Sequence, residues 1–239
     1  RPVKDVIKEI ECMDAKDILF LDPSPIENVD YAKRLYQELI PLNIKWAGLA
    51  TTKIIDDEEL FTLAVKSGCT GLLMGFETIS QITLQQVNKG FNCVNKYKEV
   101  VEKLHDNGIR VLGCFMFGFD NDDKSIFEKT VEFADRLKID ILRYAVYTPF
   151  PGTTTYYELK MQGRIIEDNW ALYDNEHVVF RPAKMTPEEL QEGLYKAWKQ
   201  SYTIGSIFRR LSGKHIHLLS IAANFGFRYY ARELEKGGN

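Results

Sequence analysis

The stretch that decides the fold is Ile109-Arg110-Val111-Leu112-Gly113-Cys114-Phe115-Met116-Phe117, followed directly by Gly118-Phe119-Asp120. Its nearly continuous apolar character is typical of a strand buried on both faces, as in a parallel sheet covered by helices. Gly108 precedes the run and is placed to end a helix predicted over residues 95–107. The sequence therefore predicts a helix, a buried strand and a loop in that order.

The same pattern recurs along the first two-thirds of the chain. Strands are predicted over residues 17–21, 44–49, 70–76, 109–117 and 140–147, with helices between them and a helix ahead of the first strand. The strands start about 26 to 38 residues apart, which suits β–α units with short loops. We therefore predict an α/β fold, a partial (β/α) TIM-like barrel whose first strand is missing.

A doubly wound open sheet is the competing fold. It is disfavoured because no strand is followed by the glycine-rich turn of a dinucleotide site.

Two helix starts carry capping patterns. Asp56 is placed to cap a helix, with Glu59 three residues later and Ile55 and Leu60 as a hydrophobic staple. Thr186-Pro187-Glu188-Glu189 reads as a second capping box, opening an amphipathic helix to about Tyr202. Another helical stretch is predicted over residues 216–235. We divide the chain into a partial barrel, residues 1–155, and a C-terminal helical extension, residues 156–239.

Composition limits the function classes. The 239 residues are 45% hydrophobic and 27% charged, with a net charge of −3, which is typical of a globular protein. No basic field points to nucleic acid, and no apolar stretch is long enough to span a bilayer. The four cysteines are widely spaced and form no CxxC metal site, so a reducing, cytoplasmic setting is expected.

Ligands of parallel α/β sheets bind at the carboxyl ends of the strands. The candidate ligand-binding residues at the strand ends are Asp22, Thr51, Lys53, Gly75, Glu77, Phe117, Gly118, Tyr147 and Thr148. Asp22 and Glu77 are also placed to cap the helices that follow them, which is the structural alternative for both carboxylates. For Glu77 we favour ligand binding, because Gly75 leaves room for a ligand close to the backbone.

No metal site is predicted from the histidines or acidic residues. Asp120, Asp122 and Asp123 fail the spacing of a calcium loop, and Asp123 is placed to cap the helix at Ser125. His177, His215 and His217 lack an acidic partner at metal-ligand spacing. Tail aromatics such as Trp198 and Phe225 lie among arginines, and could touch a membrane surface or an apolar substrate, or pack on the barrel.

Several motifs in this order resemble radical S-adenosylmethionine proteins, and most closely the group that also carries a cobalamin-binding domain. They are Arg1-Pro2-Val3 before a helix, Phe20-Leu21-Asp22, residues 71–77 (GLLMGFE), residues 88–91 (NKGF), residues 117–120 (FGFD), residues 148–153 (TPFPGT), residues 177–182 (HVVFRP) and residues 185–190 (MTPEEL).

The resemblance implies a [4Fe–4S] cluster held by a CxxxCxxC loop, and S-adenosylmethionine cleaved on it to a 5′-deoxyadenosyl radical. The cobalamin group commonly methylates unactivated carbon or rearranges carbon skeletons. This chain has neither the CxxxCxxC loop nor a cobalamin domain, and it starts with Arg1-Pro2. We therefore expect a fragment of a radical S-adenosylmethionine enzyme, inactive when isolated, that modifies an unknown substrate.

By the same resemblance, Asp22 would face the amino group of the methionine moiety, and Glu77 would face the ribose hydroxyls. Thr51 and Lys53 would lie near the methionine carboxylate. Phe117 and Gly118 would flank the adenine through their backbone, and Tyr147 and Thr148 would line the adenosyl or substrate side.

Two other functions stay open. A barrel that lost its cluster could be a non-catalytic binding or partner module, and an aldolase-type barrel could use Lys53 as a Schiff-base lysine. We expect a small-molecule or lipid-like substrate, and self-association through the apolar edge at Ile18–Leu21.

Overall fold

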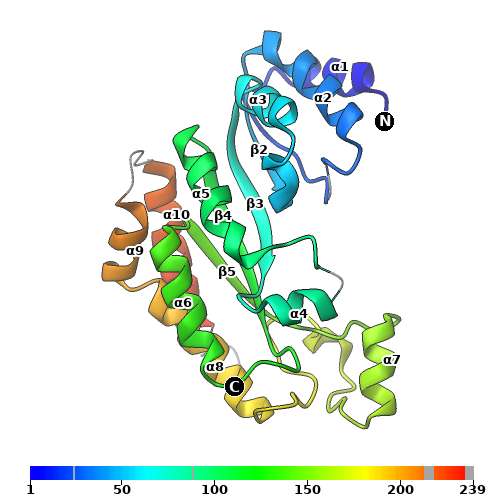
Figure 1. Ribbon diagram of the computed structural model, residues 1–239, viewed down its shortest axis with the longest axis vertical. Helices are drawn as coiled ribbons and strands as arrows, with labels where there is room; N and C mark the ends of the chain where they lie inside the picture. The colour runs from blue at the N-terminus through cyan, green and yellow to red at the C-terminus, as the bar shows by residue number, and fades with distance from the viewer. Residues whose placement is uncertain (24, 88, 213–217, 235–239) are drawn as a thin grey trace. The chain divides into compact units, whose positions relative to one another are not determined.

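The computed structural model describes residues 1–23, 25–87, 89–212 and 218–234, and groups the chain into two compact units (Figure 1). The first unit comprises Arg1–Phe76 and Phe91–Gly113, and the second comprises Glu77–Gly90 and Cys114–Asn239. The boundary falls inside two strands, β3 (Cys69–Glu77) and β4 (Arg110–Phe117), so the carboxyl ends of both strands belong to the second unit.

The first unit alternates strands and helices. Its elements are α1 (Val3–Met13), β1 (Asp17–Leu19), α2 (Val29–Leu39), η1 (Ile40–Leu42), β2 (Lys45–Ala50), η2 (Thr52–Ile55), α3 (Glu58–Lys66), most of β3, η3 (Val94–Lys96), α5 (Tyr97–Asp106) and the start of β4. The second unit holds α4 (Gln81–Gln86), the end of β4, α6 (Ile126–Leu137), β5 (Ile141–Val146), α7 (Thr154–Met161), η4 (Trp170–Leu172), α8 (Pro187–Ser201), α9 (Ile204–Leu211) and α10 (Leu218–Glu233).

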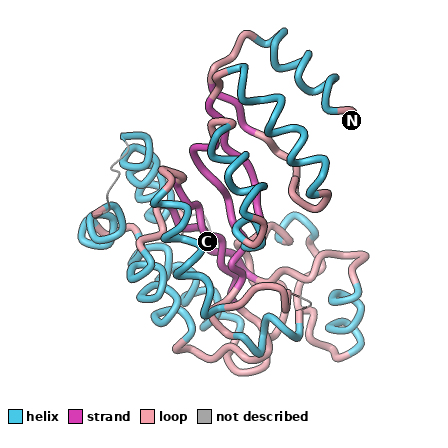
Figure 2. The backbone as a smooth tube through the Cα atoms, turned by 45° about the horizontal axis from the view of Figure 1, so that its top comes forward, coloured by secondary structure: helices cyan, strands magenta, loops and turns pink. Residues whose placement is uncertain are grey.

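The strands are parallel and follow the order β1-β2-β3-β4-β5. Figure 2 draws the strands in magenta. In the first unit Asp17 pairs with Lys45, and Trp46 pairs with Cys69 ahead of an irregularity in register. The predicted alternation of parallel strands and helices is confirmed. β1 is an edge strand, and its last residue, Leu19, is exposed, as is Leu21 beyond it. Self-association through this edge stays a prediction.

An aromatic cluster packs α2 onto the sheet of the first unit. The Trp46 ring stacks on Tyr36 of α2 at 5.1 Å and meets Phe20 edge-on at 5.6 Å between ring centroids. The Trp46 indole N–H donates to Ser67 Oγ at 3.0 Å. Burial of the Trp46 ring therefore leaves its one polar group satisfied.

The helix α3 starts one residue later than the capping pattern predicts. Asp57, not Asp56, is the N-cap, and its carboxylate accepts from the backbone N–H of Leu60 at 2.9 Å. The Asp56 cap and the Ile55–Leu60 staple are therefore wrong. Both aspartates offer the same carboxylate, and Asp57 is the one with extended backbone angles, whereas Asp56 ends the short helix η2.

The second unit is built around Tyr144 of β5. Its ring stacks on Phe117 of β4 at 5.4 Å and meets Trp198 of α8 edge-on at 5.8 Å. The Trp198 indole N–H donates to the Tyr144 carbonyl at 3.2 Å. The predicted capping box of α8 is confirmed, since Thr186 Oγ1 accepts from the Glu189 N–H and the Glu189 carboxylate accepts from the Thr186 N–H.

Two helices of the second unit, α7 and α9, were not predicted. Each begins after a threonine whose hydroxyl accepts from a backbone N–H, Thr153 for α7 and Thr203 for α9. They are eight residues long, too short for a clear helical period in the sequence. The predicted division at residue 155 lies inside α7 and stays a prediction.

The contact between α8 and α6 gives a direct test of packing. Gly193 of α8 lies against the Phe127 ring of α6, and a Cβ at residue 193 would collide with that ring. Gly193→Ala should therefore lower the free energy of unfolding by about 1–3 kcal/mol, because overpacking outweighs the helix propensity of alanine. Urea denaturation measures the difference.

The matched control is Gly226→Ala in α10, where nothing lies within 4 Å of an added Cβ. That variant should gain up to about 1 kcal/mol from helix propensity. A Gly193→Ala protein as stable as the wild type would contradict the packing described for α6 and α8.

Candidate functional site

In the first unit, the carboxyl end of β2 places Thr51 and Lys53 at one cavity. This cavity of about 280 Å³ is also lined by Glu27, Asp56 and Asp57. Thr51 is the N-cap residue of η2, and the Lys53 ammonium lies 4.9 Å from the centroid of the Phe91 ring. Two of the predicted site residues therefore share one polar pocket.

The carbonyl of Gly75 in β3 accepts a hydrogen bond from an asparagine side chain. The Asn92 amide donates to the Gly75 carbonyl at 3.0 Å, and its oxygen accepts from Thr52 Oγ1 at 2.7 Å. Asn92 is completely buried, so both polar ends of its side chain are used to join the ends of β2 and β3. Sequence reasoning missed Asn92, although it directly follows the quoted Lys89-Gly90-Phe91 run.

Asp22 lies apart from this pocket within the first unit. It is exposed in the loop after β1 and lines a different cavity, of about 540 Å³, together with Asn28, Tyr31 and residues of α1. The backbone N–H of Phe20, directly after β1, still donates to the Ala47 carbonyl at 2.9 Å. The chain therefore leaves the sheet between Phe20 and Asp22.

In the second unit, Glu77 ends β3 in a left-handed conformation, with φ at 67°. Its side chain is 13% exposed, and its carboxylate lies 3.4 Å from the Lys89 ammonium. The alternative role as a helix cap is excluded, because Ser80 is the N-cap of α4 and accepts from the Thr83 N–H. Helix capping therefore does not explain why a carboxylate lies at the end of this strand.

The turn after β4 is organised by a buried carboxylate. Asp122 Oδ2 accepts from the backbone N–H of Gly118 at 3.0 Å and of Phe119 at 3.1 Å, while its Oδ1 is buried without a hydrogen-bond partner. Burial raises the pKa of Asp122 to about 6, against the lowering effect of these two N–H donors. Sequence reasoning treated Asp122 only as part of an acidic run and missed this role.

Gly118 itself has little room. Its φ is 103°, and a Cβ there would lie 2.8 Å from Cδ2 of Leu190 in α8. The Phe117 side chain is fully buried against Phe127 and Tyr144. Only backbone groups of residues 117 and 118 are thus available to a ligand.

The end of β5 joins that of β4. The Tyr147 N–H donates to the Phe117 carbonyl at 2.8 Å, and its ring lies 4.6 Å from that of Phe119. The Thr148 hydroxyl is used locally, since it donates to the Val146 carbonyl at 3.2 Å. In the second unit the structure therefore brings Phe117, Gly118 and Tyr147 together.

Asp120, Asp123 and His177 form hydrogen bonds or ion pairs with other protein groups. Asp120 forms a two-pronged ion pair with Arg164, at 2.6 and 3.2 Å, and Asp123 accepts from the Ser125 N–H at 2.8 Å. The predicted Asp123 cap is wrong, because Ser125 is the N-cap residue of α6. His177 does have an acidic partner, Asp174, whose carboxylate lies 2.8 Å from Nδ1. His215 and His217 lie outside the described residues.

The cysteines do not fit an iron–sulfur cluster. Cys69 and Cys114 lie on strands, and burial raises the pKa of their thiols to about 12 and about 11, whereas cluster ligands are thiolates. Among the residues that the structure describes, no group of three His, Cys, Asp or Glu side chains could hold a metal ion.

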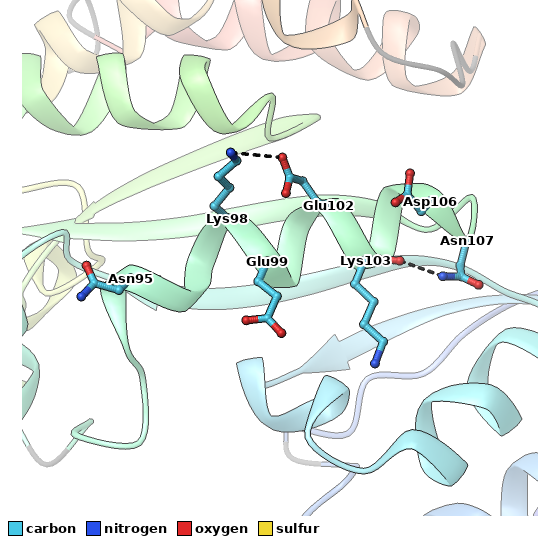
Figure 3. Close-up of a pocket in the computed structure, with 7 residues that line it drawn as sticks. All are labelled: Asn95, Lys98, Glu99, Glu102, Lys103, Asp106 and Asn107. Carbon is cyan, nitrogen blue, oxygen red and sulfur yellow. Dashed lines mark hydrogen bonds and ion pairs between the residues drawn. The ribbon is translucent and has the colours of Figure 1, made fainter.

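A third hollow, of about 470 Å³, lies along α5 and is lined by charged and amide side chains (Figure 3). The Lys98 ammonium pairs with Glu102 at 3.7 Å, and the Asn107 amide donates to the Lys103 carbonyl. All lining residues come from η3, α5 or Asn107, the residue that ends α5, so their side chains do not converge on a ligand. We regard this surface as a solvated helix face.

Comparison with known proteins identifies the family. The family model described as the radical SAM superfamily matches residues 1–134. The chain belongs to the radical SAM superfamily. It is 31% identical over 212 residues to bacteriochlorophyllide d C-12(1)-methyltransferase of Chlorobaculum tepidum, which covers 87% of this chain and 46% of that protein. It is 26% identical over 218 residues to the anaerobic magnesium-protoporphyrin IX monomethyl ester cyclase of Cereibacter sphaeroides, covering 87% and 35%.

The fold comparison agrees with the family. The radical S-adenosylmethionine methyltransferase TsrM of Kitasatospora setae, solved with cobalamin and a [4Fe–4S] cluster, aligns with a TM-score of 0.70 at 15% identity. The alignment covers 99% of this radical SAM chain and 56% of TsrM. The predicted partial (β/α) barrel is thereby confirmed. The chain spans less than half the length of the curated relatives it matches.

Within the part of the chain that the structure describes, none of the helices has both the length and the apolar character needed to cross a bilayer.

The Asp122 carboxyl predicts a pH dependence of stability. Its pKa is higher in the folded than in the unfolded protein, so the folded state holds the proton more tightly. This contribution is complete below the unfolded value near 4 and is lost as the pH rises through about 6. Asp122→Asn should remove about 1 kcal/mol of the stability change between pH 5 and pH 7, measured by urea denaturation.

Asp123→Asn is the control, because Asp123 is exposed and its pKa is lowered by hydrogen bonds to Ser125. It should keep the wild-type change between pH 5 and pH 7. If Asp122→Asn also keeps that change in full, the raised pKa of Asp122 is refuted.

The cysteine geometry predicts that this chain does not assemble a [4Fe–4S] cluster on its own. Anaerobic incubation with iron and sulfide, followed by visible absorption, tests this. We expect no stoichiometric thiolate-to-iron band near ~400 nm. A band that reaches one cluster per chain would show that the four thiols can converge after all.

Proposed function

We propose that this chain supplies S-adenosylmethionine-binding and substrate-facing residues to a radical S-adenosylmethionine enzyme that methylates a small molecule. Membership of the superfamily supports the cofactor, and the methyltransferases among the relatives support the reaction. The observation that carries the proposal is the Glu77 carboxylate, mostly buried at a strand end and not used as a helix cap.

Glu77 fits a ribose diol chemically. A carboxylate can accept two hydrogen bonds from neighbouring hydroxyls, and such charged hydrogen bonds are stronger than neutral ones. The left-handed backbone at Glu77 is uncommon for a residue other than glycine, and such strain is concentrated at functional sites. The Lys89 ion pair would orient the carboxylate until a ligand binds.

The turn after β4 would contact the adenine through its backbone. Asp122 already takes the N–H groups of Gly118 and Phe119, and its own N–H donates to the Phe119 carbonyl at 2.9 Å. The Gly118 carbonyl is therefore the group on this turn that we propose for a ligand. Bound S-adenosylmethionine supplies an activated sulfonium carrying methyl and adenosyl groups. Tyr147, whose hydroxyl lies 3.2 Å from Thr155 Oγ1, would line the adenosyl or substrate side.

In the first unit, Thr51 and Lys53 would bind the methionine carboxylate. The Lys53 ammonium is exposed, and the Phe91 face beside it provides a second favourable contact for its charge. Asp22 would face the methionine amino group, a role supported only by its place after β1. By analogy with TsrM, the protein as a whole would also bind a [4Fe–4S] cluster and cobalamin.

The substrate class follows the relatives by analogy. Two relatives are named for reactions of bacteriochlorophyllide d and of magnesium-protoporphyrin IX monomethyl ester. Such macrocycles are therefore the first substrates to test. A second candidate function is a binding module without a cluster, because no group of three His, Cys, Asp or Glu side chains among the described residues could hold a metal ion.

The test of the cofactor assignment is Glu77→Ala. Loss of charged hydrogen bonds to a ribose diol costs roughly 1.5–3 kcal/mol, which is about ten- to a hundredfold in affinity. We expect S-adenosylmethionine to bind that much more weakly in calorimetric titration of the protein, with the fold preserved in thermal melting.

The control is Ser80→Ala, which removes the α4 cap. It should lower stability by about 1 kcal/mol and leave S-adenosylmethionine binding unchanged. Unchanged affinity of Glu77→Ala would sink the cofactor role of Glu77.

A further inference from the structure

The side chains of β5 alternate between a covered face and an open face in the second unit. Leu142, Tyr144 and Val146 are buried. The ring of Tyr144 packs on Trp198 of α8. Arg143, between them in the sequence, is exposed. Because successive side chains of a strand point to opposite faces, Arg143 points away from α8. Parallel sheets are usually covered on both faces, so an exposed cation in the middle of a strand needs an explanation.

Arg143 lies beside Cys114 of the neighbouring strand β4. The hydrogen bond from the Tyr147 N–H to the Phe117 carbonyl sets the register of the two parallel strands. Counting back three residues from Val146 and Phe117 brings Arg143 opposite Cys114. Burial raises the pKa of the Cys114 thiol to about 11, while the Arg143 guanidinium lowers it and the Glu77 carboxylate raises it. Arg143 and Glu77 therefore both act on one thiol.

Tyr230 of α10 is a second neighbour of the Arg143 guanidinium. Burial raises the pKa of Tyr230, and the carboxylates of Glu176 and Asp174 raise it further, whereas Arg143 lowers it. The Tyr230 hydroxyl donates to the Glu176 carboxylate. The guanidinium thus lies between the thiol of β4 and the phenol of α10, within the second unit.

The acidic groups near Tyr230 are already used by other donors. Asp174 lies 2.8 Å from His177 Nδ1 and accepts from two backbone N–H groups at 2.8 and 3.0 Å. Glu176 takes the Tyr230 hydroxyl. Among the residues that the structure describes, none forms a hydrogen bond or an ion pair with the Arg143 guanidinium. Its donors are therefore open to a ligand.

We propose that Arg143 binds a carboxylate of the small-molecule substrate, on the same face as the S-adenosylmethionine that Glu77 would hold. A guanidinium is always charged, and its paired N–H donors match the two oxygens of a carboxylate. A phosphate monoester is the poorer ligand, because it carries about two negative charges at pH 7. Asp174 and Glu176 act on the same tyrosine as Arg143, so the extra charge would be repelled.

This inference rests on the proposed function, since it takes the substrate to be a small molecule of the macrocycle class suggested above. Protoporphyrin IX is the probe, because it carries propionate carboxylates on such a ring. Its dimethyl ester has the same ring without a free carboxylate. The two probes therefore differ only in the group that Arg143 would bind.

The experiment titrates the full chain with each probe and follows binding by the quenching of tryptophan fluorescence. We expect the wild type to bind protoporphyrin IX about tenfold more tightly than the dimethyl ester. This is the lower end of what charged hydrogen bonds contribute, because Arg143 is exposed. Arg143→Gln should bind protoporphyrin IX about tenfold more weakly than the wild type does. Its affinity for the dimethyl ester should stay within about twofold of the wild type, since the contact is already absent.

Arg136→Gln is the matched control, because Arg136 is an exposed arginine of the same unit on α6. It should bind protoporphyrin IX as the wild type does. Arg143→Lys keeps the charge without the paired donors, so it should lose only part of the affinity. S-adenosylmethionine should bind Arg143→Gln and the wild type equally in calorimetric titration. Thermal melting checks that each variant is folded.

The proposal is overturned if protoporphyrin IX does not bind, if its dimethyl ester binds as tightly, or if Arg143→Gln binds like Arg136→Gln. A loss of S-adenosylmethionine affinity in Arg143→Gln, with protoporphyrin IX binding kept, would assign the guanidinium to the methionine carboxylate instead. If the wild type binds the probes as expected but fails to bind S-adenosylmethionine, the proposed function fails and the carboxylate site at Arg143 stands.

Discussion

The packing of the last third of the chain depends on the buried guanidinium of Arg210. The Arg210 side chain reaches the carbonyls at the start of β5, the end of α8 and the Asn224 amide of α10, and its charge lies near Asp135 of α6. A buried cation is costly unless most of its donors are satisfied. Both terminal nitrogens of the Arg210 guanidinium donate hydrogen bonds, whereas Nε lies 3.4 Å from the Asp135 carboxylate without one. Four separate elements must therefore hold their positions together, and this requirement fixes which sides of α9 and α10 face outward.

The strand ends follow a similar principle on a smaller scale. Asn92 binds the Gly75 carbonyl and the Thr52 hydroxyl, and Asp122 binds the N–H groups of Gly118 and Phe119. Neither side chain needs to touch a ligand to matter. Each fixes the backbone of a loop, so that the groups presented at the strand end keep one geometry.

The sequence predicted the long elements better than the short ones. The apolar runs of β3 and β4 and the capping box at Thr186 were clear because many residues, or a reciprocal pair of side chains, carry the signal. The choice between Asp56 and Asp57 depends on backbone angles that no local pattern records. Asn92 was missed because its partners, the Gly75 carbonyl and the Thr52 hydroxyl, are far away in the sequence. Asp122 was missed because its partners are backbone N–H groups of its own turn, which no residue pattern marks. In the candidate site, the sequence named residues at the right strand ends, but it could not show that Thr148 and Phe117 use their side chains for packing and local hydrogen bonds.

The contact between Gly118 and Leu190 links two segments that are far apart in the sequence. Leu190 occupies the space where a side chain at residue 118 would begin. A larger residue at position 118 would push against α8, and a reshaped α8 would press on the turn after β4. In evolution, the C-terminal helices and this turn are therefore expected to change as a pair. A chimera that takes its C-terminal helices from a relative would have to take residue 118 and its neighbours along with them.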